Sequence, residues 1–291
     1  MIQWHLKLSN WRAYSRLMRM EKPIGIYLLL WPTFWALWIA AEGMPSWHHF
    51  IVFSLGVVIM RAAGCVINDY ADRDFDGHVE RTKLRPIPAG DATAKEALQL
   101  FTLLIVLAFA LVLTLDIKTI LLSFVALLLA ASYPFMKRYT HFPQIVLGAA
   151  FSWSIPMAFM AVSGELSATV WLLYLANLAW TVAYDTYYAM VDREDDLKIG
   201  VKSTAIAFGR YDLIAILLLQ IIMLASFIAI GQLHQMSWPF YLALALSTLM
   251  FIKQFWSSRL RDRQACFKAF LDNHYVGLAV FLGIAAHYFF V

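Results

Sequence analysis

Hydrophobic residues are grouped along this chain into long runs, and polar residues are confined to the short connections between them. Each run has about 20 mostly apolar residues, enough for a helix to cross the hydrocarbon core of a bilayer. The runs cover residues 24–41, 47–67, 97–115, 119–136, 143–163, 168–190, 211–231, 237–257 and 272–290. This pattern predicts an all-α, polytopic integral membrane protein, with about nine transmembrane helices in a bundle.

Composition supports this class and excludes others. Of the 291 residues, 62% are hydrophobic and 14% are charged, against about 45–50% and 25% in soluble domains. The net charge of +4 comes without a polybasic tract, so nucleic acid is not an expected partner. No connection is long enough for a separate soluble domain, and we expect residues 1–291 to form one transmembrane domain.

The basic residues predict an orientation. Lys and Arg occur in the N-terminal segment and in every second connection after it, whereas Lys118 is the only one in the alternate connections. The positive-inside rule places the first set in the cytoplasm. We therefore predict a multi-pass membrane protein with its N-terminus on the cytoplasmic side.

Two acidic clusters stand at the ends of hydrophobic runs. Motif 1, residues 68–76, reads N-D-Y-A-D-R-D-F-D, and motif 2, residues 185–196, reads D-T-Y-Y-A-M-V-D-R-E-D-D. An even number of predicted crossings separates them, so both lie on the same side of the membrane. Helical spacing places Asp69, Asp72 and Asp76 on one face, and Asp185, Asp192 and Asp196 on another.

Carboxylates stacked in this way repel one another unless cations lie among them. Mg²⁺ takes oxygen ligands, typically one or two carboxylates together with substrate phosphates. Two facing clusters therefore indicate two or more Mg²⁺ ions that clamp a diphosphate. The alternative interpretation, a solvated acidic rim, leaves the repeated spacing of the two clusters unexplained.

Several basic residues fit a diphosphate site. Arg73, Lys137, Arg138 and Lys202 belong to the same side of the membrane as the motifs, although positive-inside charge alone also explains them. Arg61 differs because it falls inside the run 47–67. It either binds a substrate carboxylate or pairs structurally with an aspartate, and the sequence does not decide between these roles.

The motifs resemble those of the UbiA-type intramembrane prenyltransferases. Asn68, Asp69, Asp72 and Asp76 match the family pattern N-D-x-x-D-x-x-x-D, and motif 2 matches D-x-x-Y-A-x-x-D-x-x-x-D. The segments K-P-I-G at 22–25, R-A-A-G-C at 61–65, Y-P-F-M-K-R-Y at 133–139 and K-S-T-A at 202–205 are similar to the bacterial hydroxybenzoate branch.

The resemblance implies a helical bundle around a central cavity, with two related halves that carry one motif each. It also implies transfer of a polyprenyl group from polyprenyl diphosphate to the ring carbon ortho to the hydroxyl of 4-hydroxybenzoate, in ubiquinone biosynthesis, with Mg²⁺ as cofactor. It further implies a place in the bacterial inner membrane, with both motifs on the cytoplasmic side. No protein partner is expected.

The resemblance and the chemistry together give each residue a predicted role. Asp185 or Asp69 is the base, and Tyr188 faces the substrate. The predicted metal ligands are Asn68, Asp72, Asp76, Asp192 and Asp196. The predicted anion clamp consists of Arg73, Lys137, Arg138 and Lys202.

Other functions are less compatible with the pattern. A transporter would carry its charges near the bilayer midplane, whereas these clusters lie at one boundary. A CDP-alcohol phosphotransferase concentrates its aspartates in one segment, and here the motif is duplicated. Within the resembling family, another aromatic acceptor such as a naphthoate stays open.

Overall fold

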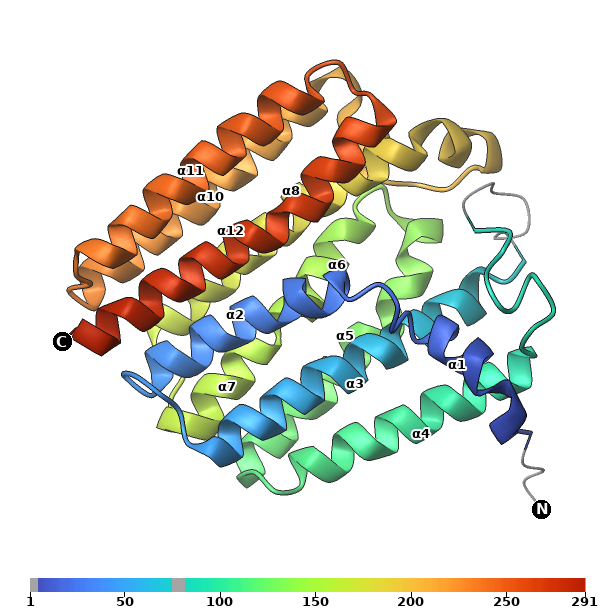
Figure 1. Cartoon of the computed structure of the whole chain (residues 1–291), viewed down its shortest axis with the longest axis horizontal. Coiled ribbons are helices and arrows are strands. Elements are labelled where there is room, and N and C mark those ends of the chain that lie inside the picture. Colours follow the sequence, from blue (N-terminus) through green and yellow to red (C-terminus); the bar gives the residue numbers. More distant parts are fainter. Residues whose placement is uncertain (1–4, 75–81, 291) are drawn as a thin grey trace.

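The computed structural model describes residues 5–74 and 82–290, except for the side chain of residue 199. The described chain is helical, as predicted, and its long helices lie side by side (Figure 1). The elements are η1 (Leu8–Asn10), α1 (Trp11–Leu17), α2 (Ile24–Ala40), α3 (Trp47–Asp72), α4 (Ala94–Val112), α5 (Ile117–Tyr139), α6 (Pro143–Ser152), α7 (Ser154–Ser163), α8 (Ala168–Ile199), α9 (Thr204–Phe208), η3 (Gly209–Tyr211), α10 (Asp212–Leu233), α11 (Trp238–Ser258) and α12 (Arg263–Phe290).

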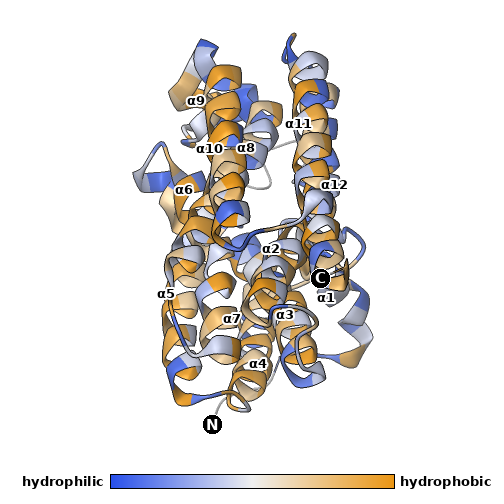
Figure 2. Ribbon diagram, turned by 90° about the vertical axis from the view of Figure 1, so that its left-hand side faces the viewer, coloured by the Kyte–Doolittle hydropathy of each residue, from blue (hydrophilic) through white to orange (hydrophobic). Residues whose placement is uncertain are grey.

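Apolar side chains cover much of the outer surface of the bundle. Leu121, Leu128, Leu218, Ile221 and Leu249 are each at least half exposed, and Figure 2 shows hydrophobic residues along the middle of the helices, with hydrophilic residues mainly towards their ends. A soluble protein rarely exposes so much contiguous apolar surface. The chain is therefore a multi-pass membrane protein.

Seven helical segments among the described residues are long and apolar enough to cross a membrane. They include α6 and α7 taken together and α9 and α10 taken together. Helix α2 is shorter, with 17 residues, and α8 is not among the seven. The count of about nine crossings therefore stays a prediction.

The largest differences from the predicted boundaries lie at the motif end of the bundle. Helix α3 continues to Asp72 and α8 to Ile199, beyond the predicted ends at 67 and 190. A hydropathy window stops where charged residues begin, but the backbone hydrogen bonds of a helix continue through them. The described part of motif 1 and all of motif 2 up to Asp196 thus lie mainly on helices.

The predicted helix 143–163 is broken into α6 and α7 at Trp153. Pro156 lacks the N–H that would bond to the carbonyl of Ser152 four residues earlier, and α6 ends at that residue. The indole of Trp153 donates a hydrogen bond to the Leu122 carbonyl at 2.9 Å. The break is therefore attached to α5.

The central core joins α2, α8 and α12 around Gly277. The indole of Trp35 donates to the Gly277 carbonyl at 3.0 Å, and a Cβ at Gly277 would lie 2.6 Å from Trp31 and 2.7 Å from Trp180. Only glycine allows the rings to pack this closely against α12.

Gly277→Ala is expected to destabilise the fold by about 1–3 kcal/mol, because the two indole rings have to move. Melting of the detergent-purified protein measures this effect. Gly56→Ala in α3 is the matched control, since nothing lies within 4 Å of its added methyl group and alanine favours a helix. Equal melting temperatures for both variants would contradict this packing.

Candidate active site

Buried polar contacts hold the N-terminal segment against α4. Thr93 and Glu96 form a capping box at the start of this helix. The same Glu96 carboxylate accepts hydrogen bonds from the Tyr14 hydroxyl at 2.6 Å and from the Asn10 amide at 3.0 Å. These contacts fix α1, which lies at the same end of the bundle as the connection between α8 and α10 (Figure 1).

Asp69 of motif 1 is neutralised by two arginines from different loops. Its carboxylate is 2.6 Å from the Arg19 guanidinium and 3.2 Å from that of Arg85, and the residue is 1% exposed. Burial alone would lower the pKa of Arg19, but the negative charge of Asp69 raises it above the ordinary value. Arg19 therefore stays protonated, and the pair links the N-terminal segment to α3.

Asp72 lies one turn further along α3, and only one of its two carboxylate oxygens has a hydrogen-bond partner. Its Oδ2 atom is 2.5 Å from the Lys137 ammonium and accepts a hydrogen bond from the Asn68 amide at 3.2 Å. Its Oδ1 atom is buried without a hydrogen-bond partner. A carboxylate oxygen in this state is costly and is the type of ligand that Mg²⁺ prefers. The donor set of Asn68 and Asp72 thus fits this metal.

Motif 2 lies on α8 and faces the same cavity as motif 1. Asp185, Tyr188, Asp192 and Asp196 all line it and are neither fully buried nor fully exposed. The Tyr188 ring packs on Phe270 of α12, with 4.8 Å between the ring centroids. The structure therefore brings the two motifs together, as their placement on one side of the membrane predicts.

The cavity has a volume of about 1290 Å³, larger than the ~300–1,000 Å³ of typical small-molecule pockets. Its charged part lies at the motif end of the helices. Its apolar part includes Val106, Phe109 and Phe124, which are 59%, 36% and 48% exposed at the outer surface of the bundle. The cavity thus extends from the charged boundary to the apolar surface between α4 and α5. Further apolar lining residues are Leu28, Val52, Leu111, Val112 and Leu115.

Within residues 5–74 and 82–290, no three His, Cys, Asp or Glu side chains are grouped so that they alone could hold a metal. Each motif instead offers a small set of oxygen ligands. Mg²⁺ sites commonly combine one or two carboxylates with phosphate oxygens of the substrate. Such sites are complete only when the substrate is present. Asp76, a predicted ligand, lies outside the described residues.

Two predicted members of the anion clamp line the cavity and two do not. Lys137 and Lys202 line it, and the backbone N–H of Lys202 donates to the Lys137 carbonyl at 3.2 Å. Arg138 is not among the lining residues; its guanidinium donates to the Ala71 carbonyl at 2.5 Å. This bond connects the end of α5 to the end of α3.

Arg73 is not among the described residues that line the cavity, and its place in the anion clamp stays a prediction. Helix α3 ends at Asp72, and the Arg73 guanidinium turns back to the Tyr70 carbonyl at 2.8 Å and to the Asp74 carboxylate at 3.6 Å. Local contacts therefore hold it away from the cavity.

Arg61 lines the cavity, but its hydrogen bonds go to backbone carbonyls. Its guanidinium donates to Met18 at 2.8 Å, to Arg19 at 3.4 Å and to Lys22 at 3.3 Å. A Cβ at Gly25 would lie 2.6 Å from its Nε atom, so a larger residue there would displace the guanidinium. Among the described carboxylates, none forms an ion pair with Arg61, and the predicted pairing with an aspartate is not found in this part of the chain.

Several lining residues escaped prediction. Arg16, Arg19, Lys22 and Arg85 lie in loops, where positive-inside charge gives every basic residue the same explanation. Tyr133 belongs to a segment that supports the family resemblance, but it stands among apolar residues, and nothing in that pattern indicates a place in the site. The signal that these residues share is their place on the same side of the membrane as the motifs.

Known proteins are similar to this chain over nearly its whole length. The model of the UbiA prenyltransferase family matches residues 29–283. The 4-hydroxybenzoate octaprenyltransferases of Enterobacter sp. (strain 638) and Salmonella paratyphi B are 59% and 58% identical to it over 287 residues, which are 99% of this chain and 99% of each relative.

Solved structures share the fold. The apo structure of a UbiA homologue from Aeropyrum pernix K1 has a TM-score of 0.79 at 26% identity, covering 90% of this chain and 97% of that one. A UbiA homologue from Archaeoglobus fulgidus, bound to GPP and Mg²⁺, has a TM-score of 0.67 at 17% identity and covers 94% and 99%. With the family model and these relatives in agreement, the chain belongs to the UbiA prenyltransferase family.

Proposed function

We propose that this protein transfers a polyprenyl group from polyprenyl diphosphate to 4-hydroxybenzoate, giving 3-polyprenyl-4-hydroxybenzoate in ubiquinone biosynthesis. The observation that carries the proposal is one cavity with two carboxylate motifs and several basic side chains, Lys137 and Lys202 among them, at its charged end and an apolar remainder. A polyprenyl diphosphate has the same division between a charged head and an apolar tail. Relatives 58–59% identical over their full length carry the corresponding name.

The residues that would hold Mg²⁺ are Asn68 and Asp72 on α3 and Asp192 and Asp196 on α8, with Asp76 as a further ligand by sequence. When bound, the metal neutralises the diphosphate and stabilises the charge that develops on it as it leaves. Lys137 and Lys202 add positive charge at the same boundary. Arg138 would support the diphosphate site indirectly, because its hydrogen bond to Ala71 joins the end of α5 to the end of α3.

Arg61 suits the carboxylate of the acceptor. It carries a full positive charge in the cavity wall, and its hydrogen bonds go to neutral carbonyls. A bound benzoate would supply the missing negative charge. Tyr188 lies in the same wall as Asp185 and would contact the substrate there.

In the reaction, the bond from prenyl C1 to the diphosphate oxygen breaks, and its electron pair leaves with the diphosphate. The ring carbon ortho to the hydroxyl bonds to C1, and the proton on that carbon passes to a base. Asp185 is better suited to this role than Asp69, because Asp69 is held by two arginines. The apolar walls keep water away from the allylic centre.

The protein is proposed to lie in the bacterial inner membrane with both motifs towards the cytoplasm. The asymmetric distribution of Lys and Arg supports this orientation. We also propose that residues 1–291 form one domain, built from two related halves that carry one motif each.

Turnover is expected to require Mg²⁺. Membranes containing the protein, incubated with polyprenyl diphosphate and labelled 4-hydroxybenzoate, should form a lipid-soluble labelled product that EDTA abolishes and excess Mg²⁺ restores. A parallel reaction with a labelled naphthoate tests the acceptor. Product formation that ignores EDTA, or preference for the naphthoate, would contradict the proposal.

Asp192→Ala is expected to reduce turnover by about 100-fold or more, because a charge-stabilising ligand is lost. The matched control is Asp195→Asn, three residues further along α8, whose carboxylate pairs with Arg263 and Lys198 instead. Rates measured at equal protein levels should separate the two variants. Near wild-type turnover of Asp192→Ala would refute its assignment as a ligand.

Asp185→Asn should lower kcat by about 10²–10⁴-fold, the usual contribution of a general base. The concentration of Mg²⁺ needed for half-maximal rate should stay unchanged, since Asp185 is not assigned to the metal. If kcat is retained, or if only the Mg²⁺ requirement changes, Asp185 is not the base.

A further inference from the structure

The five residues 192–196 at the end of α8 divide between the cavity and the neighbouring parts of the chain. Asp192 and Asp196 line the cavity. Glu194 and Asp195 instead pair with Arg263 of α12, at 2.7 and 3.3 Å. Arg193 pairs with Asp212. Part of the acidic cluster therefore attaches α8 to its neighbours and does not face the substrate.

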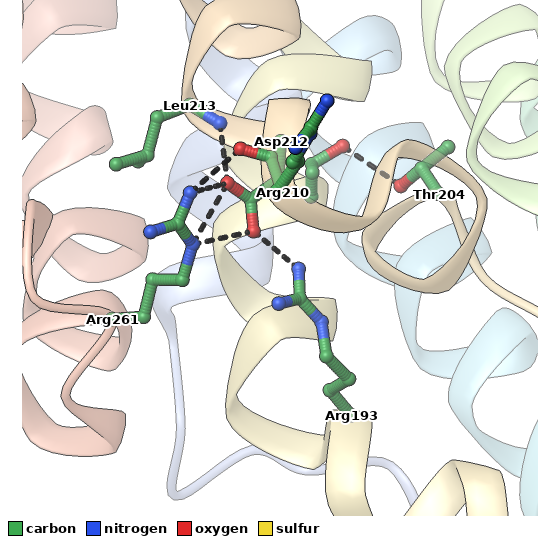
Figure 3. A network of polar contacts seen from close by, with 7 residues as sticks. Arg193, Thr204, Arg210, Asp212, Leu213 and Arg261 are labelled. Atoms are coloured by element: carbon green, nitrogen blue, oxygen red, sulfur yellow. Dashed lines mark hydrogen bonds and ion pairs between the residues drawn. The ribbon is translucent and has the colours of Figure 1, made fainter.

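Asp212 is the centre of a buried network (Figure 3). It is the first residue of α10 and is 0% exposed. Its carboxylate accepts a hydrogen bond from its neighbour's backbone, Leu213 N–H, at 2.6 Å, and lies 2.9 Å from the Arg261 guanidinium. Arg193 binds the other carboxylate oxygen. Asp212 thus balances two arginines from different parts of the chain.

Arg193 stands beside the proposed metal ligands in sequence but not in space. It follows Asp192 directly and precedes Asp196 by three residues, a spacing at which oppositely charged side chains on a helix form ion pairs. The two positions are only about 60° apart around the helix axis. Yet the Arg193 guanidinium lies with Asp212 (Figure 3) and is not part of the cavity wall.

We propose that Asp212 is a positioning residue that holds Arg193 away from Asp196, and so keeps Arg193 from competing with Mg²⁺ for the carboxylates of motif 2. The inference rests on the proposed function for the identity of the metal site. Arg261 has a second partner, the Arg210 carbonyl at 2.9 Å. Arg193 has Asp212 as its one described ion-pair partner, and its buried Nε atom has no hydrogen bond.

Loss of the Asp212 carboxylate would therefore affect Arg193 most. A buried charge without a partner is strongly unfavourable, and Asp196 is within reach on the same helix. An Arg193–Asp196 pair would compete directly with Mg²⁺. This competition can be told apart from a simple loss of structure, because removing Arg193 as well should restore Mg²⁺ binding.

The test compares Asp212→Asn, Arg193→Gln and the double variant with the wild type. The readout is the Mg²⁺ concentration at half of the maximal thermal stabilisation, measured on purified protein with inorganic diphosphate. The same preparations are assayed for product. Arg263→Gln is the control, because it removes ion pairs from the same end of α8 without touching Asp212.

Asp212→Asn should raise the Mg²⁺ midpoint on the order of tenfold, as loss of residues that orient metal ligands commonly does. Arg193→Gln, the double variant and Arg263→Gln should stay close to the wild type. An unchanged midpoint in Asp212→Asn, or a double variant as defective as Asp212→Asn, would overturn the inference.

Arg193→Gln keeps the inference testable if Asp212→Asn does not fold. If Arg193 served only to anchor α8, its loss would raise the midpoint, and that result would also overturn the inference. Failure of the proposed function is a separate outcome. In that case the wild type forms no product, while the midpoints still rank the variants.

Discussion

Charge compensation at the edge of an apolar bundle is the constraint on which the rest of this structure depends. Asp69, Asp72 and Asp212, which the chain buries there, are each matched by a cation from a distant segment, because an isolated buried charge is too costly to keep. These pairs connect the loops and helix ends that surround the cavity. The main ones are Asp69 with Arg19 and Arg85, Asp72 with Lys137, and Asp212 with Arg193 and Arg261.

The same constraint separates structural carboxylates from functional ones. Both carboxylate oxygens of Asp212 are bound by arginines, whereas Asp69 and Asp72 each keep one buried oxygen without a hydrogen bond. Asp69 differs from Asp72 because two arginines already balance its charge. A saturated carboxylate holds helices together. One with a spare oxygen at a cavity wall is able to take a metal ion. On α8, carboxylates that line the cavity and carboxylates that pair with α12 occur within five residues, so a single helix end both anchors the bundle and contributes to the cavity wall.

The helix positions were largely predictable, because a run of apolar residues identifies a helix whatever its neighbours are. The placement of both motifs on the same side of the membrane was also predictable, since it follows from an even number of crossings, but their position at one cavity depends on how α3 and α8 pack. The partners of Asp69 were not, because ion pairs between distant loops depend on tertiary packing. The contacts of Arg73 were not predictable either, because angular spacing gives the direction of a side chain from the helix and not the partner that its end selects. The roles of Glu194 and Asp195 required the position of α12.

The central claim is that both carboxylate motifs hold one diphosphate through metal ions. The most direct measurement is a structure of the protein with Mn²⁺ in place of Mg²⁺ and an unreactive prenyl thiolodiphosphate, in which anomalous scattering locates the metal. The account predicts anomalous peaks beside Asp72 and beside Asp192 or Asp196, with the diphosphate between them and the prenyl tail in the apolar cavity. Metal at only one motif, or a diphosphate bound elsewhere, would contradict it.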